Sequence, residues 1–128
     1  MLIVGNGARL AGTGGLIYEL IEKTHIPVLP GMNTVDMVQD KYRIGFIGTY
    51  GNRIANMILD ESDLVISVGA RLGLRQIGHI KERFAPRAKL IRCDVDQYEL
   101  GRQVKDDEEK YNFDARYFME LLLSLIHI

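Results

Sequence analysis

Three uninterrupted apolar runs, each followed at once by small or charged residues, constrain this chain most strongly. Residues 2–4, 64–68 and 90–93 run into Gly5-Asn6-Gly7, Gly69-Ala70-Arg71 and Asp94-Val95-Asp96. Continuous Val, Ile and Leu runs without polar alternation are typical of strands buried on both faces, as in a parallel sheet covered by helices. In such open sheets, ligands lie beyond the carboxyl ends of the strands. We therefore expect the three turns to converge on one crevice at that edge.

Helical periodicity between the apolar runs completes the fold prediction. Helices are predicted over 14–23, over 54–59 with Asn52 as cap, more weakly over 76–84, over 97–102, and from an Asp114 cap to Leu125. Further strands are predicted at 26–29 and 111–113, and the charged residues 105–110 are predicted to form a solvated loop. Strands that alternate with helices indicate βαβ units. We expect a three-layer α/β, Rossmann-like domain with a mainly parallel sheet of five or six strands.

Composition excludes several classes of partner. The chain has 128 residues, a formal net charge of −1 and 47% hydrophobic residues, which predicts no strong attraction to nucleic acid or to an anionic membrane. No apolar run approaches the roughly 20 residues that span a bilayer. The single cysteine, Cys93, cannot form an internal disulfide and is compatible with the reducing cytoplasm, where we expect the protein to act. The three histidines lack metal-ligand spacing, so we predict no metal site.

The turn at Gly5-Asn6-Gly7 suggests a dinucleotide site, but the match is incomplete. It follows a strand and precedes a helix, as phosphate-binding turns do. A full fingerprint has a third glycine or alanine where this chain has Leu10. It also has an acidic residue after the second strand, where this chain has Leu29-Pro30-Gly31. The usual nicotinamide-dinucleotide interpretation therefore fails on two counts.

Six segments in a fixed order carry a family resemblance. They are Val4 to Gly7, Ile26-Pro27-Val28, Gly48 to Asn56, Ser62 to Arg71, Phe84 to Lys89, and Asp94-Val95-Asp96. In this order they resemble the central domain of thiamine-diphosphate-dependent enzymes, and acetolactate synthase and similar decarboxylases and carboligases most of all. The resemblance covers nearly the whole chain. We expect residues 1–123 to form this domain and residues 124–128 to be a tail, produced by truncation or by the boundaries chosen for expression.

The resemblance implies a domain that contributes no catalytic residue. In the family, a first domain supplies a glutamate that activates the thiazolium ring, and a third supplies a Gly-Asp-Gly motif for magnesium and diphosphate. This chain contains no Gly-Asp-Gly sequence. Thiamine diphosphate and Mg²⁺ would thus be bound by flanking domains of a parent chain that forms a homo-oligomer. The implied parent reaction is decarboxylation of a 2-keto acid and ligation of the resulting carbanion equivalent.

Some members of the family hold FAD in the central domain, chiefly as a structural cofactor. The positions of this chain that match the flavin contacts are Gly5, Asn6, Gly7, Gly48, Gly51, Gly69, Ala70, Arg71, Arg75 and Asp94. Three places depart from the flavin-binding pattern: Asn6, Thr49-Tyr50 and Gly73-Leu74. Two further interpretations stay open beside FAD binding. The domain is a scaffold without a ligand, or it is a free-standing module that binds a nucleotide or FAD.

Each predicted contact residue also has a structural explanation. The glycines allow tight turns between strands and helices. Arg71 and Arg75 are suited to ion pairs with Asp36, Asp40 or a neighbouring chain. Asp94 and Asp96 are suited to capping the helical turn that follows them.

Overall fold

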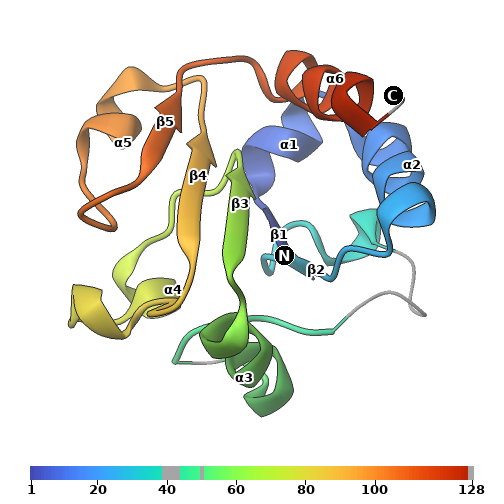
Figure 1. The fold of residues 1–128 in the computed structure, drawn as a ribbon. Coiled ribbons are helices and arrows are strands. Elements are labelled where there is room, and N and C mark those ends of the chain that lie inside the picture. The colour runs from blue at the N-terminus through green and yellow to red at the C-terminus, as the bar shows by residue number, and fades with distance from the viewer. Residues whose placement is uncertain (39–43, 50, 127–128) are drawn as a thin grey trace.

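A five-stranded, wholly parallel sheet forms the centre of the computed structural model, which describes residues 1–38, 44–49 and 51–126 (Figure 1). Its strands are β1 (Leu2–Val4), β2 (Val28–Pro30), β3 (Leu64–Val68), β4 (Lys89–Cys93) and β5 (Glu109–Tyr111). They lie in the order β2-β1-β3-β4-β5, and every neighbouring pair is parallel. The predicted three-layer α/β architecture is thereby confirmed.

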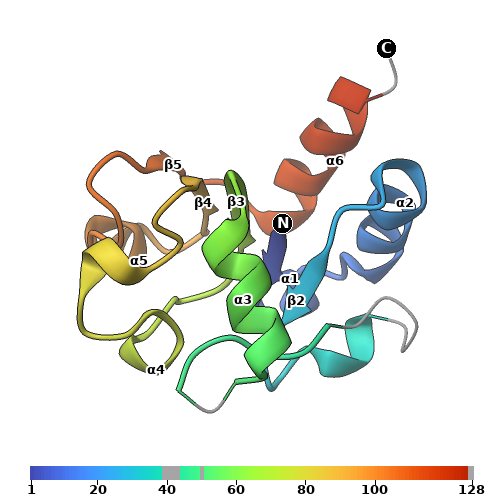
Figure 2. The ribbon, with the colours of Figure 1, turned by 60° about the horizontal axis from the view of Figure 1, so that its bottom comes forward.

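Helices cover both faces of the sheet, which explains why its strands lack polar alternation. The elements outside the sheet are α1 (Asn6–Leu10), α2 (Gly14–Thr24), η1 (Val35–Met37), α3 (Arg53–Glu61), α4 (Leu74–Ile77), η3 (Lys81–Arg83), α5 (Gln97–Gly101) and α6 (Ala115–Ile126). The α2 and α6 helices lie side by side on one face (Figure 1). Figure 2 shows α3 across the opposite face. Residues of β1 alternate between the two cores, with Leu2 in one and Ile3 in the other.

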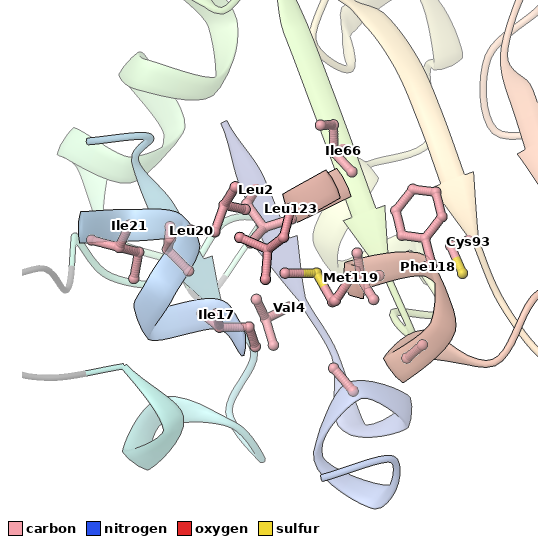
Figure 3. Close-up of a cluster of buried hydrophobic side chains, with 14 of the residues drawn as sticks. Leu2, Val4, Ile17, Leu20, Ile21, Ile66, Cys93, Phe118, Met119 and Leu123 are labelled. Carbon is pink, nitrogen blue, oxygen red and sulfur yellow. The ribbon is translucent and has the colours of Figure 1, made fainter. Parts of the chain in front are cut away.

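The larger core lies between the sheet and the α2–α6 pair. Ile17 and Leu20 of α2 and Met119 and Leu123 of α6 point toward Val4 of β1 (Figure 3). Their helical spacing of three or four residues places each pair on the face that meets the sheet. Burial of a side chain of this size contributes about 1.5–3 kcal/mol to folding. This packing fixes β1, and with it the turn that follows the strand, at the middle of the sheet.

The second core contains α3 and the segments that connect β3 to β4 and β4 to β5. Ala55 and Leu59 of α3 pack with Ile3, Val65 and Leu90 of three adjacent strands. The side chain of Asn52 accepts hydrogen bonds from the backbone N–H groups of Ile54 and Ala55, which confirms its predicted role as the cap of this helix. The α3 helix begins where its cap satisfies amides that have no partner within the helix.

The structure refines three local predictions. The weak helical stretch over 76–84, which the sequence interrupts at Gly78, is divided there into two short pieces, α4 and η3, and Gly78 takes a φ of 81° between them. The charged segment 105–110 is only partly a loop, since Glu109 and Lys110 belong to β5 and the Glu108 side chain is fully buried. The predicted turn at Gly5-Asn6-Gly7 is shorter than expected, because α1 begins at Asn6. The domain boundary at residue 123 stays a prediction, because α6 continues to Ile126, and residues 127 and 128 lie outside the described part.

Candidate functional site

The sheet changes its direction of winding between β1 and β3. The β1–β2 connection runs through α2 on one face, whereas the connections around β3 and β4 pack on the face that holds α3. In open α/β sheets of this kind, the connections diverge at such a point and leave a crevice beyond the strand ends. Gly5 and Gly69, the residues that follow β1 and β3, lie at this crevice.

Two adjoining cavities lie at this edge, and we refer to them together as the switch-point cavity. The smaller, of about 180 Å³, is lined by Gly5, Asn6, Gly31, Met32, Asn33, Thr34, Gly69, Ala70, Arg71 and Gln76. The larger, of about 420 Å³, is lined by Gly31, Met32, Phe46, Ile47, Arg75 and Gln76. Three residues are common to both linings, so the two volumes adjoin. The larger is mainly apolar, with Arg75 and Gln76 as its polar side chains.

The structure brings six of the ten predicted site residues to the switch-point cavity. They are Gly5, Asn6, Gly69, Ala70 and Arg71 in the smaller part and Arg75 in the larger. Gly7 lies against the backbone of Gly69. Gly48 lines a separate cavity that also contacts Gln76. Gly51 and Asp94 are not among the residues that line the switch-point cavity.

Gly5, Gly7 and Gly69 allow the backbones of two turns to approach closely. A Cβ atom at Gly7 would lie 2.9 Å from the Gly69 Cα, and one at Gly69 would lie 2.5 Å from the Ala8 nitrogen. The N–H groups of Gly5 and Gly7 donate to the carbonyls of Val68 and Gly69, both at 3.0 Å. These amides are therefore already used within the protein. Contacts between the turns thus require these glycines whether or not a ligand binds.

Gly48 and Gly51 have a similar role beside α4. Gly48 takes a φ of 97°, and a Cβ atom there would lie 2.6 Å from the Gln76 Cα. Its N–H donates to Asn56 Oδ1 at 2.8 Å, and its carbonyl accepts from Asn56 Nδ2 at 3.2 Å. A Cβ atom at Gly51 would lie 2.5 Å from the Phe46 carbonyl oxygen. These contacts hold the segment 44–49, which carries Phe46 and Ile47, against the helix that carries Gln76.

Arg71 forms an ion pair on the side of the turn that faces α5. Its Nε lies 3.2 Å from Glu99 Oε1, and its side chain is 81% exposed. Arg71 therefore has a partner other than the predicted Asp36, which is paired with Arg9. Asp40, the alternative partner for the two arginines, lies outside the described residues.

The acidic turn after β4 is organised by its own hydrogen bonds. Asp94 Oδ1 accepts from the N–H of Asp96 at 2.9 Å, and Asp96 Oδ1 accepts from the N–H of Tyr98 at 2.9 Å. Asp96 is thus the cap of α5, which confirms the capping role predicted for this residue as the alternative to ligand binding. Asn112, which belongs to none of the predicted site motifs, donates to the carbonyls of Asp94 and Val95 at 3.0 and 2.9 Å.

Several lining residues had no recognisable signal in the sequence. Thr34 is buried, donates to the carbonyl of Val4 at 2.8 Å and accepts from the N–H of Gly31 at 2.8 Å. It therefore ties the loop after β2 to the end of β1. Met32, Phe46, Ile47 and Gln76 come from three separate segments. Only the Pro30-Gly31 pair, at the place where an acid was expected, pointed to an unusual turn here.

Cys93 ends β4 and has no feature of a reactive thiol. The residue is 2% exposed, and its Sγ lies 3.3 Å from the carbonyl oxygen of Phe113. Burial raises the pKa of the Cys93 thiol from 9.0 to about 11. A thiol that is neutral at physiological pH is a poor nucleophile and metal ligand.

Within residues 1–38, 44–49 and 51–126, no group of three or more His, Cys, Asp and Glu side chains is placed to hold a metal ion. Among the same residues, no helix has the length and apolar character needed to cross a bilayer.

The strand order and the position of the cavity define the chain as a doubly wound α/β domain with a cavity at the switch point of its sheet. Comparison with known families identifies its kind. Residues 1–122 match the family described as thiamine pyrophosphate enzyme, central domain, and the chain belongs to this family. The resemblance seen in the sequence is thereby confirmed.

The curated relatives are large subunits of acetolactate synthases. Acetolactate synthase isozyme 1 large subunit of Escherichia coli (strain K12) is 39% identical over 122 residues, which are 94% of this chain and 21% of that protein. The probable acetolactate synthase large subunit of Methanococcus aeolicus is 34% identical over 109 residues, 84% of this chain and 18% of that protein. The chain thus spans about a fifth of the length of these relatives.

Proposed function

We propose that this chain is the central, non-catalytic domain of an acetolactate-synthase-like enzyme that decarboxylates a 2-keto acid and ligates the product to an acceptor. The observation that carries the proposal is the family match over residues 1–122 together with the names of the relatives. The domain acts as a scaffold between flanking domains of the parent chain. We further propose a homo-oligomeric parent that acts in the cytoplasm.

Thiamine diphosphate and Mg²⁺ belong, in this proposal, to the flanking domains. A magnesium-diphosphate site needs several oxygen ligands, usually carboxylates. The described residues offer no cluster of acidic side chains for it. Asp94 and Asp96 are close in sequence, but each accepts a backbone N–H in the turn that begins α5. The residues present do not fit the thiamine cofactor, so no step of the reaction is assigned to this domain.

The switch-point cavity supports a second role, the binding of an adenine nucleotide or FAD. The volume of its larger part, about 420 Å³, lies within the range of about 300–1,000 Å³ that is usual for small-molecule sites. Met32, Phe46 and Ile47 provide apolar surface for an aromatic ring. Arg71 and Arg75 would hold a diphosphate by charge-assisted hydrogen bonds. The turn amides of Gly5 and Gly7 are already paired, so the arginines would be the main anion-binding groups.

The decisive test of the scaffold proposal is the coding sequence on both sides of this segment. We expect a preceding domain with the thiamine-activating glutamate and a following domain with Gly-Asp-Gly. Open reading frames that lack both would overturn the proposal. Independently, the purified 128-residue chain is expected to form no acetolactate from pyruvate with thiamine diphosphate and Mg²⁺. Product formed above an enzyme-free control would contradict the non-catalytic role.

The nucleotide role is tested on the same purified chain. Absorbance in the flavin band would reveal FAD retained during purification. Calorimetric titration with ADP, FAD and NAD then measures binding directly. We expect heat with ADP and FAD, because the apolar cavity and the two arginines suit an adenine ring and a diphosphate. No heat with any of the three would remove the nucleotide site and leave the scaffold role standing.

A further inference from the structure

The carboxylate of Glu99 lies between two arginines at the edge of the switch-point cavity. Its Oε1 is 3.2 Å from Arg71 Nε, and its Oε2 is 3.4 Å from Arg102 Nη2. The Glu99 side chain is only 16% exposed, whereas that of Arg71 is 81% exposed. The protein therefore restricts the glutamate side chain more than the arginine side chain, and Glu99 is the partner that restrains Arg71.

Glu99 is fixed because its backbone is bound from inside the domain. Its carbonyl accepts from Nη2 of Arg92 at 3.1 Å, and the carbonyl of Arg102 accepts from Nη1 of the same arginine at 2.8 Å. Arg92 belongs to β4, is 2% exposed and is paired with the buried Glu108. The end of α5 is thus attached to a central strand of the sheet by one buried guanidinium.

The turn that carries Arg71 is bound to α5 as well. Arg102 donates to the carbonyls of Arg71 and of Leu72, the latter at 3.0 Å. Leu72 is fully buried and takes a φ of 53°, a conformation that leucine rarely adopts and that persists only where its surroundings enforce it. The guanidinium of Arg102 supplies part of that enforcement by satisfying both carbonyls.

We propose that Glu99 is a positioning residue for Arg71, which it holds ready for the diphosphate of a nucleotide in the switch-point cavity. The ion pair places Glu99 Oε1 beside Nε, away from the two Nη groups of Arg71. Among the residues that the structure describes, no acceptor bonds to either Nη. An arginine whose side chain is restrained by an ion pair loses less conformational freedom when it binds an anion. The inference rests on the proposed nucleotide site and names the residue on which its anion contact depends.

A double-mutant cycle measured by calorimetry tests this role. Arg71→Ala is expected to weaken ADP binding about tenfold, the equivalent of one charge-assisted hydrogen bond. Glu99→Ala is expected to weaken it about threefold, because Arg71 remains but is no longer held. The double variant should match Arg71→Ala alone, since Glu99 acts only through Arg71. Binding of adenosine, which has no phosphate, should be unchanged in all three variants.

Glu120→Ala serves as the matched control. It removes the same charge from α6, where Glu120 pairs with Arg116 at the surface, and should leave ADP binding unchanged. The constant affinity for adenosine shows that a variant still folds and keeps its cavity.

The possible failures are distinguishable. If the unmodified chain binds neither ADP nor FAD, the nucleotide site and this inference are both overturned. If it binds ADP, three results overturn the positioning role alone: unchanged affinity in Glu99→Ala, tighter binding in that variant, or additive losses in the double variant. Tighter binding would mean that Glu99 competes with the anion for Arg71.

Discussion

Arg92 Nη1 lies 3.2 Å from Glu108 Oε1 at a place where the arginine side chain is 2% exposed and the glutamate side chain is fully buried. The same guanidinium also donates to the carbonyls of Glu99 and Arg102. Glu108 Oε1 in turn accepts from the N–H of Val104 at 3.1 Å. This pair therefore joins β4, α5 and the segment that leads into β5.

Removal of one partner should be far more damaging than removal of both. Arg92→Met removes the buried cation beside Glu108 and leaves only the more distant Lys110 Nζ, at 3.7 Å, and the Val104 N–H, so we expect a loss of about 3–5 kcal/mol in the free energy of unfolding. In Arg92→Met/Glu108→Leu no buried charge remains, so the loss should be smaller despite the missing carbonyl contacts. Urea unfolding followed by circular dichroism measures both values. A double variant less stable than Arg92→Met would contradict this account.

A surface ion pair gives the matching control. Arg116 and Glu120 on α6 lie 3.3 Å apart, and their side chains are 55% and 53% exposed. Arg116→Met removes the same charge as Arg92→Met. Because exposed pairs contribute about 0–1 kcal/mol, we expect a change within that range.

Alanine substitutions at Gly5 and Gly15 should change the stability of the domain in opposite directions. A Cβ atom at Gly5 would lie closer than 3.0 Å to the backbone of Gly69 and Ala70, so Gly5→Ala should cost about 1–3 kcal/mol. Gly15 lies in the first turn of α2 with no atom within 4 Å of a new Cβ. Gly15→Ala should stabilise the domain by about 0.4–1 kcal/mol, because the unfolded chain loses freedom. Thermal melts compare the two; a stable Gly5→Ala protein would refute the close approach of the turns.

Loss of the α3 cap should destabilise the second core. Asn52 Oδ1 accepts from two backbone N–H groups, at 2.7 and 3.3 Å. Asn52→Ala leaves both without this partner, and we expect a loss of about 1 kcal/mol. Asn52→Ser should recover most of it, because serine caps about as well as asparagine. Urea midpoints measure the series. If serine were no better than alanine, a lost contact other than the cap would be responsible.

The Cys93 thiol should make stability fall at alkaline pH. Burial raises its pKa from 9.0 to about 11, so the folded state keeps a proton that the unfolded state loses. Its contribution is complete below pH 9 and is lost as the pH rises from 9 to about 11. The slope from this thiol is at most about 1.4 kcal/mol per pH unit. The free energy of unfolding of the unmodified chain should therefore fall more steeply over this range than that of Cys93→Ala. Parallel curves would contradict the assignment.

The sequence predicted the elements that are both apolar and long enough to show a period. Residues 64–68 and 89–93 were recognisable as strands because both faces of the sheet are covered, and α2 and α3 because their apolar residues recur on one face. Asn52 and Asp114 were recognisable as caps because their short acceptor side chains precede apolar periodicity. Asp114 Oδ2 does accept from the N–H groups of Arg116 and Tyr117, at 3.0 and 3.4 Å.

The features that the sequence did not reveal depend on contacts between segments that are distant in the chain. A buried charge resembles a solvated one in sequence, so nothing in residues 105–110 revealed that Glu108 meets Arg92 16 positions earlier. The lining of the cavity also could not be predicted, because Met32, Phe46 and Gln76 come together only when three separate segments fold onto the edge of the sheet. The predicted glycines do lie at or near this edge. Their packing against one another, which uses the turn amides, could not be read from spacing.

The position of β1 in the sheet has a consequence for synthesis of the protein. It is the first strand of this domain in chain order, yet in the sheet it lies between β2 and β3. Its carbonyl and amide groups can pair on both sides only when the chain has been made as far as Val68. Until then the apolar residues Leu2, Ile3 and Val4 lack one of their two neighbouring strands, and an unpaired apolar strand edge associates readily with other nascent chains. A chaperone that binds the emerging segment would protect it during this interval.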